Sequence, residues 1–376
     1  MARFLIFYFV AYGGSHIYLF VKLKRAFSLS PKKQFLVTPF LATLFLAPLI
    51  ARKLESSNLD RLAELFSGGG YLWMGLLFLF VTATASMDIL NLCCRKTGFN
   101  ISPKSLFLAA VAYTLIIGSY GYLEAKNIVT EHLTIKSSRL PANAERIRIV
   151  QISDVHVGQI VREKRIKAIL DKVKAASPDI LVSTGDLVDG HQKHFTGLEH
   201  LFLELKPKLG KYAILGNHEY YVGSAESEKF MRDAGFKVLN NENFELGGLI
   251  SLTGVDDSRK KVDRAANAII EGRLLDSAPK GVFRLLLKHR PVIEKGSAGK
   301  FDLQLSGHVH KGQIFPFNFL TWLSFPVRSG HTVLKSGSQL YVSRGTGVWG
   351  PPIRFLAPPE ITVIDLFPEN GITKKN

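Results

Sequence analysis

Hydrophobic residues follow different patterns in the first third of the chain and in the remainder. The first third contains four long apolar stretches, Phe4–Val21, Phe35–Ala51, Tyr71–Leu92 and Leu106–Leu123. Each stretch approaches the roughly 20 residues that a helix needs to span a bilayer. Four stretches in succession cannot be a cleavable signal peptide. The pattern therefore predicts a transmembrane region with about four helices over residues 1–125.

Beyond residue 146, short apolar runs alternate with charged turns and amphipathic segments. Runs of this length, bounded by glycine and polar residues, are typical of buried strands. The expected strands are 146–152, 179–183, 212–215, 250–254, 283–287 and 301–305, and a helix is expected over 160–175. Strands that alternate with helices indicate an α/β domain. We therefore predict such a domain over residues 146–376, after a linker at 126–145.

Polar side chains gather where the predicted strands end. The successive strand ends carry Asp154 and His156, Gly185-Asp186, Gly216-Asn217-His218-Glu219, Asp256 and Asp257, His289, and Gly307-His308-Val-His310. In α/β domains, ligands bind beyond the carboxyl ends of the strands. Five of the eleven histidines are therefore expected to meet at one edge of a sheet, together with several carboxylates and one amide.

Such a cluster predicts a metal centre. Many ionisable groups packed together without a cation would leave buried charge uncompensated. Ligands that mix imidazole and carboxylate, with no thiolate, favour zinc, manganese or iron over calcium, magnesium or an iron–sulfur cluster. The only cysteines, Cys93 and Cys94, lie in the apolar region, so the α/β domain has no disulfide framework and the redox compartment stays open.

The formal charge of +17 raises the question of nucleic-acid binding. The lysines and arginines are spread along the chain, and no helix-turn-helix, zinc knuckle or basic–aromatic repeat accompanies them. A membrane protein that meets anionic lipid or a phosphorylated substrate explains the excess at least as well. We expect a phosphorylated substrate and the bilayer as partners and no nucleic acid, and the oligomeric state stays open.

The basic residues also bear on orientation. The loop after the first apolar stretch holds the densest basic cluster among the short loops, Lys22, Lys24, Arg25, Lys32 and Lys33. By the positive-inside rule this loop is cytoplasmic. Four spans then place the α/β domain of this integral inner-membrane protein on the extracytoplasmic side. If the second stretch, which contains Pro39 and Pro48, is only re-entrant, the orientation inverts.

The order and type of these strand-end motifs resemble the calcineurin-like metallophosphoesterases. The resemblance covers about residues 146–367, and the closing text from Tyr341 through Ile361 resembles the membrane-anchored bacterial branch, which includes transmembrane metallophosphoesterase-domain proteins. It implies a sandwich of two mixed sheets flanked by helices, which holds two divalent metal ions about 3.5 to 4 Å apart.

The resemblance also implies roles for individual residues. One metal ion would be bound by Asp154, His156 and His310, the other by Asn217, His289 and His308, and both by Asp186. His218 would be the catalytic residue that stabilises phosphate charge or protonates the leaving oxygen. Arg344 and Arg354 are candidates for binding substrate phosphate. Asp189 and Glu219 either support the metal ligands or cap their own loops, and the sequence leaves both roles open.

The predicted function is hydrolysis of phosphate esters by metal-activated hydroxide, on a lipid-linked or membrane-presented phosphate or pyrophosphate. The aromatic-rich segment 315–326 is the reason to expect a lipid substrate. This segment is either an interfacial surface or part of the domain's own core. Two alternatives stay open: a phosphodiesterase or phosphatase of soluble nucleotides or other small phosphoesters, and a non-catalytic metal-binding membrane scaffold.

Overall fold

The structure is a computed structural model that describes residues 8–57, 59–96, 100–257 and 261–369. The chain divides into two compact units. The helical unit comprises the chain up to residue 124 together with 350–355, and the α/β unit comprises 125–349 and the chain from 356 onward. Residues 350–355 therefore group with the helices, although the sequence placed them in the α/β domain.

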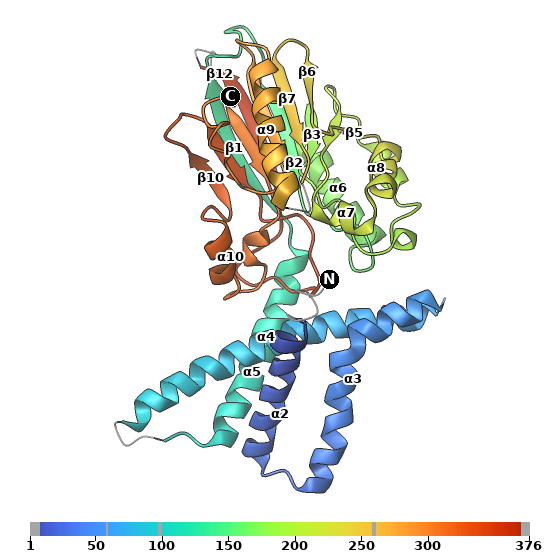
Figure 1. Cartoon of the computed structure of the whole chain (residues 1–376), viewed down its shortest axis with the longest axis vertical. Helices are drawn as coiled ribbons and strands as arrows, with labels where there is room; N and C mark the ends of the chain where they lie inside the picture. The colour runs from blue at the N-terminus through green and yellow to red at the C-terminus, as the bar shows by residue number, and fades with distance from the viewer. Residues whose placement is uncertain (1–7, 58, 97–99, 258–260, 370–376) are drawn as a thin grey trace. The chain divides into compact units, whose positions relative to one another are not determined.

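Within its described residues, the helical unit contains a short π-helix and four α-helices (Figure 1). They are η1 (Tyr8–Gly13), α2 (Gly14–Phe27), α3 (Pro31–Ser56), α4 (Asp60–Arg95) and α5 (Pro103–Lys126). Among the described residues, α3, α4 and α5 are long and apolar enough to cross a membrane. The first predicted stretch begins at Phe4–Phe7, outside the described residues, and continues through η1 into α2.

Polar side chains inside the helical unit are paired with one another. Trp73 Nε1 donates a hydrogen bond to His16 Nε2 at 2.9 Å, and His16 Nδ1 lies 2.8 Å from the Tyr12 carbonyl. Asp88 accepts from Tyr18 and forms an ion pair with Lys22. Polar groups among apolar helices are costly unless paired, so these contacts tie α2 to α4.

The described part of the α/β unit is built on two six-stranded sheets, each with parallel and antiparallel pairs. The first sheet has the order β1 (Val129–Ser137), β12 (Glu360–Pro368), β2 (Ile147–Ile152), β3 (Ile180–Ser183), β4 (Lys211–Ala213), β5 (Lys237–Val238). The second has the order β10 (Gly330–Val333), β11 (Gln339–Val342), β9 (Leu303–Ser306), β8 (Phe283–Lys288), β7 (Ile250–Val255), β6 (Glu242–Leu246).

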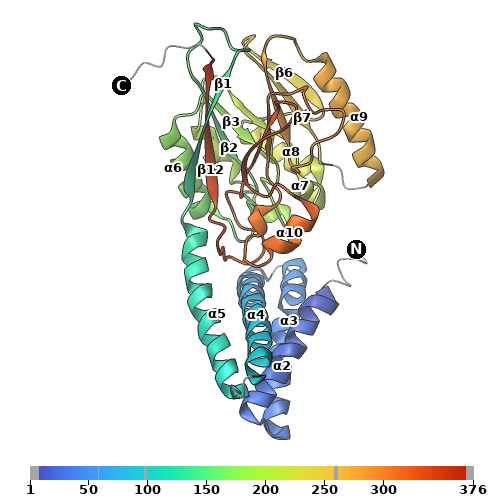
Figure 2. The same cartoon turned by 90° about the vertical axis from the view of Figure 1, so that its left-hand side faces the viewer.

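The two sheets pack face to face and helices cover their outer faces. In Figure 2, α6 (Glu163–Ala176) lies outside the first sheet and α9 (Lys261–Ser277) outside the second. Ile149 of β2 belongs to the core between the sheets, whereas its neighbour Val150 packs in the core under α6. Because side chains alternate between faces, β2 must be apolar on both.

Shorter helices connect these elements. They are α7 (Asn217–Val222), α8 (Ser224–Asp233), α10 (Asn318–Ser324) and the 3₁₀ turns η2 (Gln192–His194), η3 (Glu199–Glu204) and η4 (His310–Gly312). The architecture confirms the predicted fold class of two mixed sheets with helices, preceded by apolar helices. All six predicted strands are present, with ends that shift by a few residues.

The predicted linker at 126–145 is wrong for its central part. Residues 129–137 form β1, which pairs in parallel with β12 from Val129↔Glu360 to Ser137↔Pro368. The alternation of Leu133 and Ile135 with polar neighbours is a strand pattern for one buried face. Pairing with β12 satisfies its backbone groups, so the first sheet begins directly after α5.

Candidate metal centre

The seven predicted metal ligands follow the ends of five strands. Asp154 and His156 follow β2, Asp186 follows β3, Asn217 follows β4, His289 follows β8, and His308 and His310 follow β9. Six of these side chains are buried and His308 is half-buried. The strand ends thus bring together residues from positions 154 to 310.

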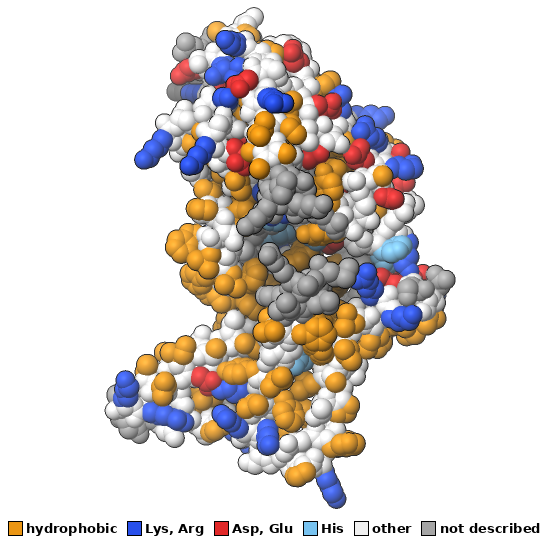
Figure 3. All heavy atoms as spheres, in the orientation of Figure 1, with side chains coloured by type: hydrophobic (Ala, Val, Ile, Leu, Met, Phe, Trp, Pro, Cys, Tyr) orange, Lys and Arg blue, Asp and Glu red, His pale blue; other side chains and the backbone are white. Residues whose placement is uncertain are grey.

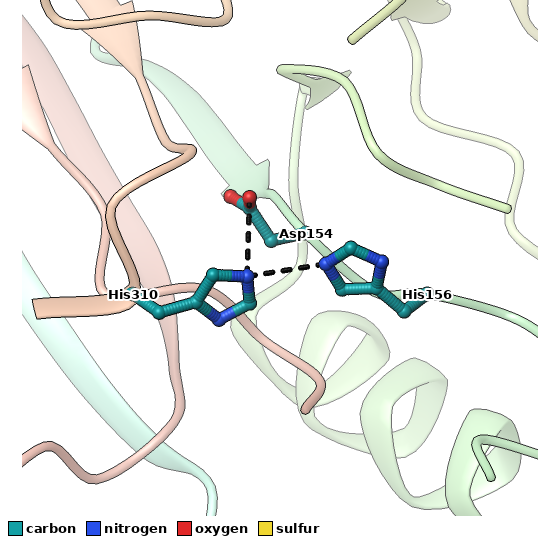
Figure 4. A group of neighbouring side chains, drawn as sticks. All are labelled: Asp154, His156 and His310. Carbon is teal, nitrogen blue, oxygen red and sulfur yellow. Dashed lines mark hydrogen bonds and ion pairs between the residues drawn. The ribbon is translucent and has the colours of Figure 1, made fainter. Parts of the chain in front are cut away.

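Asp154, His156 and His310 form the first group of side chains able to hold a metal ion (Figure 4). His310 Nε2 lies 3.1 Å from His156 Nε2 and 3.4 Å from Asp154 Oδ1. One possible ligand atom from each residue lies within 4.8 Å of the others. Two ring nitrogens and a carboxylate that face one another in a buried site are donors suited to a divalent cation.

Asp186, His289 and His308 form the second group. His289 Nε2 lies 3.2 Å from Asp186 Oδ2 and 3.2 Å from His308 Nδ1. His289 Nδ1 lies 2.8 Å from the Thr184 carbonyl, which can only accept, so Nδ1 carries the proton. The Nε2 lone pair is then directed at the group. A second hydrogen bond of this kind is usual for metal-bound histidine.

The pKa values of the two buried aspartates are shifted in opposite directions. Burial raises the pKa of Asp154. Burial also acts to raise the pKa of Asp186, but neighbouring imidazoles, His289 first, bring it well below its usual value. Asp186 Oδ1 also accepts a hydrogen bond of 2.8 Å from the His218 backbone. Asp186 is therefore held as a carboxylate, the form that binds cations.

The backbone around the ligands is strained. Five of the seven ligand residues have positive φ, namely Asp154, His156, Asp186, His308 and His310. A Cβ atom on Gly307 would lie 1.9 Å from Ser153 Oγ and 2.1 Å from Asp154 Oδ2, so only glycine fits there. Such conformations cost free energy and persist where the surrounding structure enforces them, often at functional sites.

His218 lies beside the first group and is held by Asp189. His218 Nδ1 lies 2.7 Å from Asp189 Oδ1, and its ring meets that of His156 edge to face at 4.6 Å. Burial lowers the pKa of His218, but the charges of Asp186 and Asp189 outweigh this effect and raise it to about 9. Asp189 also lies 3.5 Å from His156 Nδ1. Asp189 therefore orients the imidazole of His218.

Glu219 braces the loops from within. Its carboxylate accepts hydrogen bonds from the backbone N–H groups of Asp186, Gly216 and Val188 at 2.7–3.1 Å, and the residue is fully buried. Burial raises the pKa of Glu219 to about 7. Of the two roles left open by the sequence, these contacts are those of a loop cap.

The two arginines predicted to bind substrate have other surroundings. Arg344 forms ion pairs of 2.5 and 2.6 Å with Glu131 and Glu360. Arg354 belongs to the helical unit, where its backbone N–H donates to the Gly121 carbonyl at 2.9 Å and its side chain is fully buried. Neither is a member of the two ligand groups, and their substrate role stays a prediction.

Sequence reasoning missed Arg290, the residue after His289. Arg290 Nε lies 2.7 and 2.9 Å from the two carboxylate oxygens of Asp257. One terminal nitrogen lies 3.2 Å from His308 Nε2 and the other 3.4 Å from Asn217 Oδ1. In the sequence, the only sign of these contacts is that Arg290 follows the predicted ligand His289. The contact with Asn217 joins residues 73 positions apart, so the sequence does not show it.

Comparisons with known proteins agree with this geometry. The family described as calcineurin-like phosphoesterase matches residues 147–312, which contain both ligand groups and His218. An uncharacterized metallophosphoesterase of Aquifex aeolicus is 38% identical over 67% of this chain and 97% of its own length. YkuE of Bacillus subtilis, also an uncharacterized metallophosphoesterase, is 34% identical over 70% of this chain and 95% of its own.

A transmembrane protein with metallophosphoesterase domain from Danio rerio is 29% identical over 68% of this chain and 62% of its own length. This relative combines, by its name, the two kinds of segment described above. The strand-end motifs, the two mixed sheets and the similarity to the Aquifex protein agree with one another. The chain belongs to the calcineurin-like phosphoesterase family.

Proposed function

We propose that the protein is a membrane-anchored phosphoesterase that hydrolyses phosphate esters with two divalent metal ions. Asp154, His156 and His310 would hold one ion, Asn217, His289 and His308 the other, and Asp186 both. The observation that carries the proposal is the convergence of two buried ligand groups beside the His218–Asp189 pair. The imidazole and carboxylate donors suit manganese, zinc or iron.

The chain's own residues supply the remaining chemistry. When bound, two divalent ions neutralise phosphoryl charge and lower the pKa of water. His218 donates Nδ1–H to Asp189 and so presents Nε2 toward the site. A protonated imidazole there can donate its Nε2 proton to the departing ester oxygen. Asp189 stabilises that protonated form and fixes the ring.

A lipid-linked or membrane-presented phosphate or pyrophosphate is the proposed substrate class. Every residue of α10 is at least partly exposed. Four of its seven side chains are large and apolar with more than half of their surface exposed, Phe319, Leu320, Trp322 and Leu323. Figure 3 shows hydrophobic side chains gathered over α10. An exposed apolar helix with tryptophan suits the interface of a bilayer.

The contacts of α10 connect this surface to the site. Phe325, the residue after α10, packs edge to face on the imidazole of His308 at 5.3 Å between ring centroids. A lipid chain on α10 would therefore lie within reach of the second ligand group. Soluble phosphoesters, including nucleotides, are the alternative substrates, because the metal ligands determine the reaction and not the substrate.

We place the protein in the inner membrane with the α/β unit on the extracytoplasmic side. The supporting argument is the basic segment where α2 ends and α3 begins, with Lys22, Lys24 and Arg25 in α2 and Lys32 and Lys33 in α3, which the positive-inside rule assigns to the cytoplasm. Three candidate spans, α3, α4 and α5, follow that segment. An odd number of crossings puts the α/β unit on the opposite side from the segment, whether or not α2 spans.

The first experiment measures hydrolysis of an aryl phosphomonoester and an aryl phosphodiester by the full chain with manganese or zinc. We expect metal-dependent activity on at least one ester. Asp186→Ala should lower it by at least about 10³-fold, since a ligand of both ions is lost. Asp171→Ala, which removes an exposed carboxylate of α6, is the control. Wild-type protein that loads metal and hydrolyses neither ester nor a lipid phosphate would refute the proposal.

A further inference from the structure

Arg290 occupies an unusual position for a cation, because it lies against the second ligand group. Its two terminal nitrogens approach His308 Nε2 at 3.2 Å and Asn217 Oδ1 at 3.4 Å. A guanidinium beside two divalent ions would be repelled by them. The arrangement is favourable when an anion lies between the guanidinium and the ions. A phosphate group is such an anion, and it matches the planar fork of arginine.

The contact between Arg290 and His308 is incompatible with a metal-bound His308. His308 Nδ1 lies 3.2 Å from His289 Nε2, so an ion held by Asp186, His289 and His308 would be bound through Nδ1 of His308. The neutral imidazole then carries its proton on Nε2. Two N–H groups would face each other at the Arg290 contact, which cannot form a hydrogen bond. The terminal nitrogens of Arg290 are then available to another acceptor.

Asp257 keeps the guanidinium in place while its terminal nitrogens change partners. Both of its carboxylate oxygens contact Arg290 Nε, at 2.7 and 2.9 Å, and its side chain is only 5% exposed. This ion pair uses Nε and leaves the terminal nitrogens out. Arg290 and Asp257 also line a cavity of about 390 Å³, together with Val292 and Phe325. The cavity gives the guanidinium room to turn while Nε stays on Asp257.

We propose that Arg290, positioned by Asp257, binds the phosphate group of the substrate beside the second metal ion. Arg290 would be a substrate-binding residue and Asp257 a positioning residue that acts through it. The inference rests on the proposed function for the presence of two ions. It adds a side chain of the protein that binds the phosphate, which the strand-end motifs did not identify.

The test is calorimetric titration of inorganic phosphate into the manganese-loaded full chain, with metal content measured in every variant. Arg290→Ala should raise the Kd for phosphate at least about tenfold, because a charge-assisted hydrogen bond is lost, and both ions should remain. The phosphate Kd of Arg290→Lys should lie between those of the wild type and Arg290→Ala, since lysine keeps the charge but lacks the planar fork of arginine. Asp257→Asn should also weaken phosphate binding at full metal content. Arg232→Ala on α8, 56% exposed, is the matched control and should bind like the wild type.

Two results would overturn the inference. The first is an Arg290→Ala protein that keeps both ions and binds phosphate as the wild type does. The second is loss of metal in Arg290→Ala and Asp257→Asn, which would mean that the pair only supports His308 and Asn217. If Arg290→Ala does not fold, Arg290→Lys and Asp257→Asn decide by the same readouts.

Hydrolysis assays on the same proteins separate this inference from the proposed function. Metal-loaded wild-type protein that binds phosphate through Arg290 yet hydrolyses no ester would remove the proposed function and leave the phosphate site. Normal hydrolysis with an unchanged phosphate Kd in Arg290→Ala would remove only the inference.

Discussion

At the scale of single residues, Asp189 decides which nitrogen of His218 faces the ligand groups. Its carboxylate accepts a hydrogen bond of 2.7 Å from the Nδ1–H of His218. We expect His218→Ala to lower kcat by about 10²–10⁴-fold, the usual contribution of a proton donor. Asp189→Asn should lower kcat by about 10-fold or more, because the amide lacks the charge that holds a protonated imidazole. Steady-state kinetics on an aryl phosphate ester measures both.

The double variant makes this prediction specific. If Asp189 acts through His218, Asp189→Asn should change kcat little in the His218→Ala background. Metal content must be measured in parallel, because Asp189 also lies 3.5 Å from His156 Nδ1. An equal loss of kcat in both backgrounds, with full metal content, would contradict the assigned role.

At the scale of elements, variants of α10 test whether the substrate is lipid-linked or soluble. Trp322 and Leu323 are 53% and 75% exposed, so replacing both with serine should leave the α/β core intact. For the double serine variant we expect turnover of phosphatidate in vesicles to fall on the order of tenfold, because two interfacial anchors are lost. Turnover of a soluble aryl phosphate should stay unchanged.

The control for α10 is Val333→Ser on β10, a large apolar side chain that is 62% exposed on another element. It should affect neither substrate. Equal rates on vesicles for the α10 variant and the wild type would argue for a soluble substrate. A parallel loss on both substrates would assign α10 to the support of the site through Phe325.

At the scale of the whole molecule, the odd number of candidate spans after the basic segment predicts on which side of the membrane the α/β unit lies. We expect a cysteine at Asp171 on α6 to react with a membrane-impermeant maleimide in intact spheroplasts. A cysteine at Ser30, in the loop before α3, should react only after lysis. Both positions are exposed, and Cys93 and Cys94 must first be changed to serine. The reverse labelling pattern would place the α/β unit in the cytoplasm.

Prediction from sequence succeeded where the signal was local. β2 and β3 are apolar runs that end in an acid, and side-chain period and turn residues are enough to recognise them. β1 was missed, because its buried face carries only a few apolar residues among charged ones, and its pairing partner β12 begins at Glu360. Such a strand is recognised only together with its distant partner.

The site shows the same division. His289 and His308 were expected at strand ends, and the structure places their ring nitrogens 3.2 Å apart. The roles of Glu219 and Arg290 were not evident from sequence. Glu219 caps backbone N–H groups that are 31 and 33 residues away, and Arg290 meets Asp257 33 residues away. Contacts of this kind depend on how loops from different strands fold over one another.

The sequence by itself determined the family of the α/β domain and the helices that are apolar enough to cross a membrane, because both depend on residue types at short spacings and on long apolar runs. Only the tertiary structure decided which oxygen of Asp189 meets which nitrogen of His218, that Arg344 pairs with Glu131 and Glu360, and that α10 exposes its apolar side chains. The physical reason is that hydrogen bonds and ion pairs act over about 3 Å. Chain positions far apart in sequence reach that distance only after the two sheets have packed.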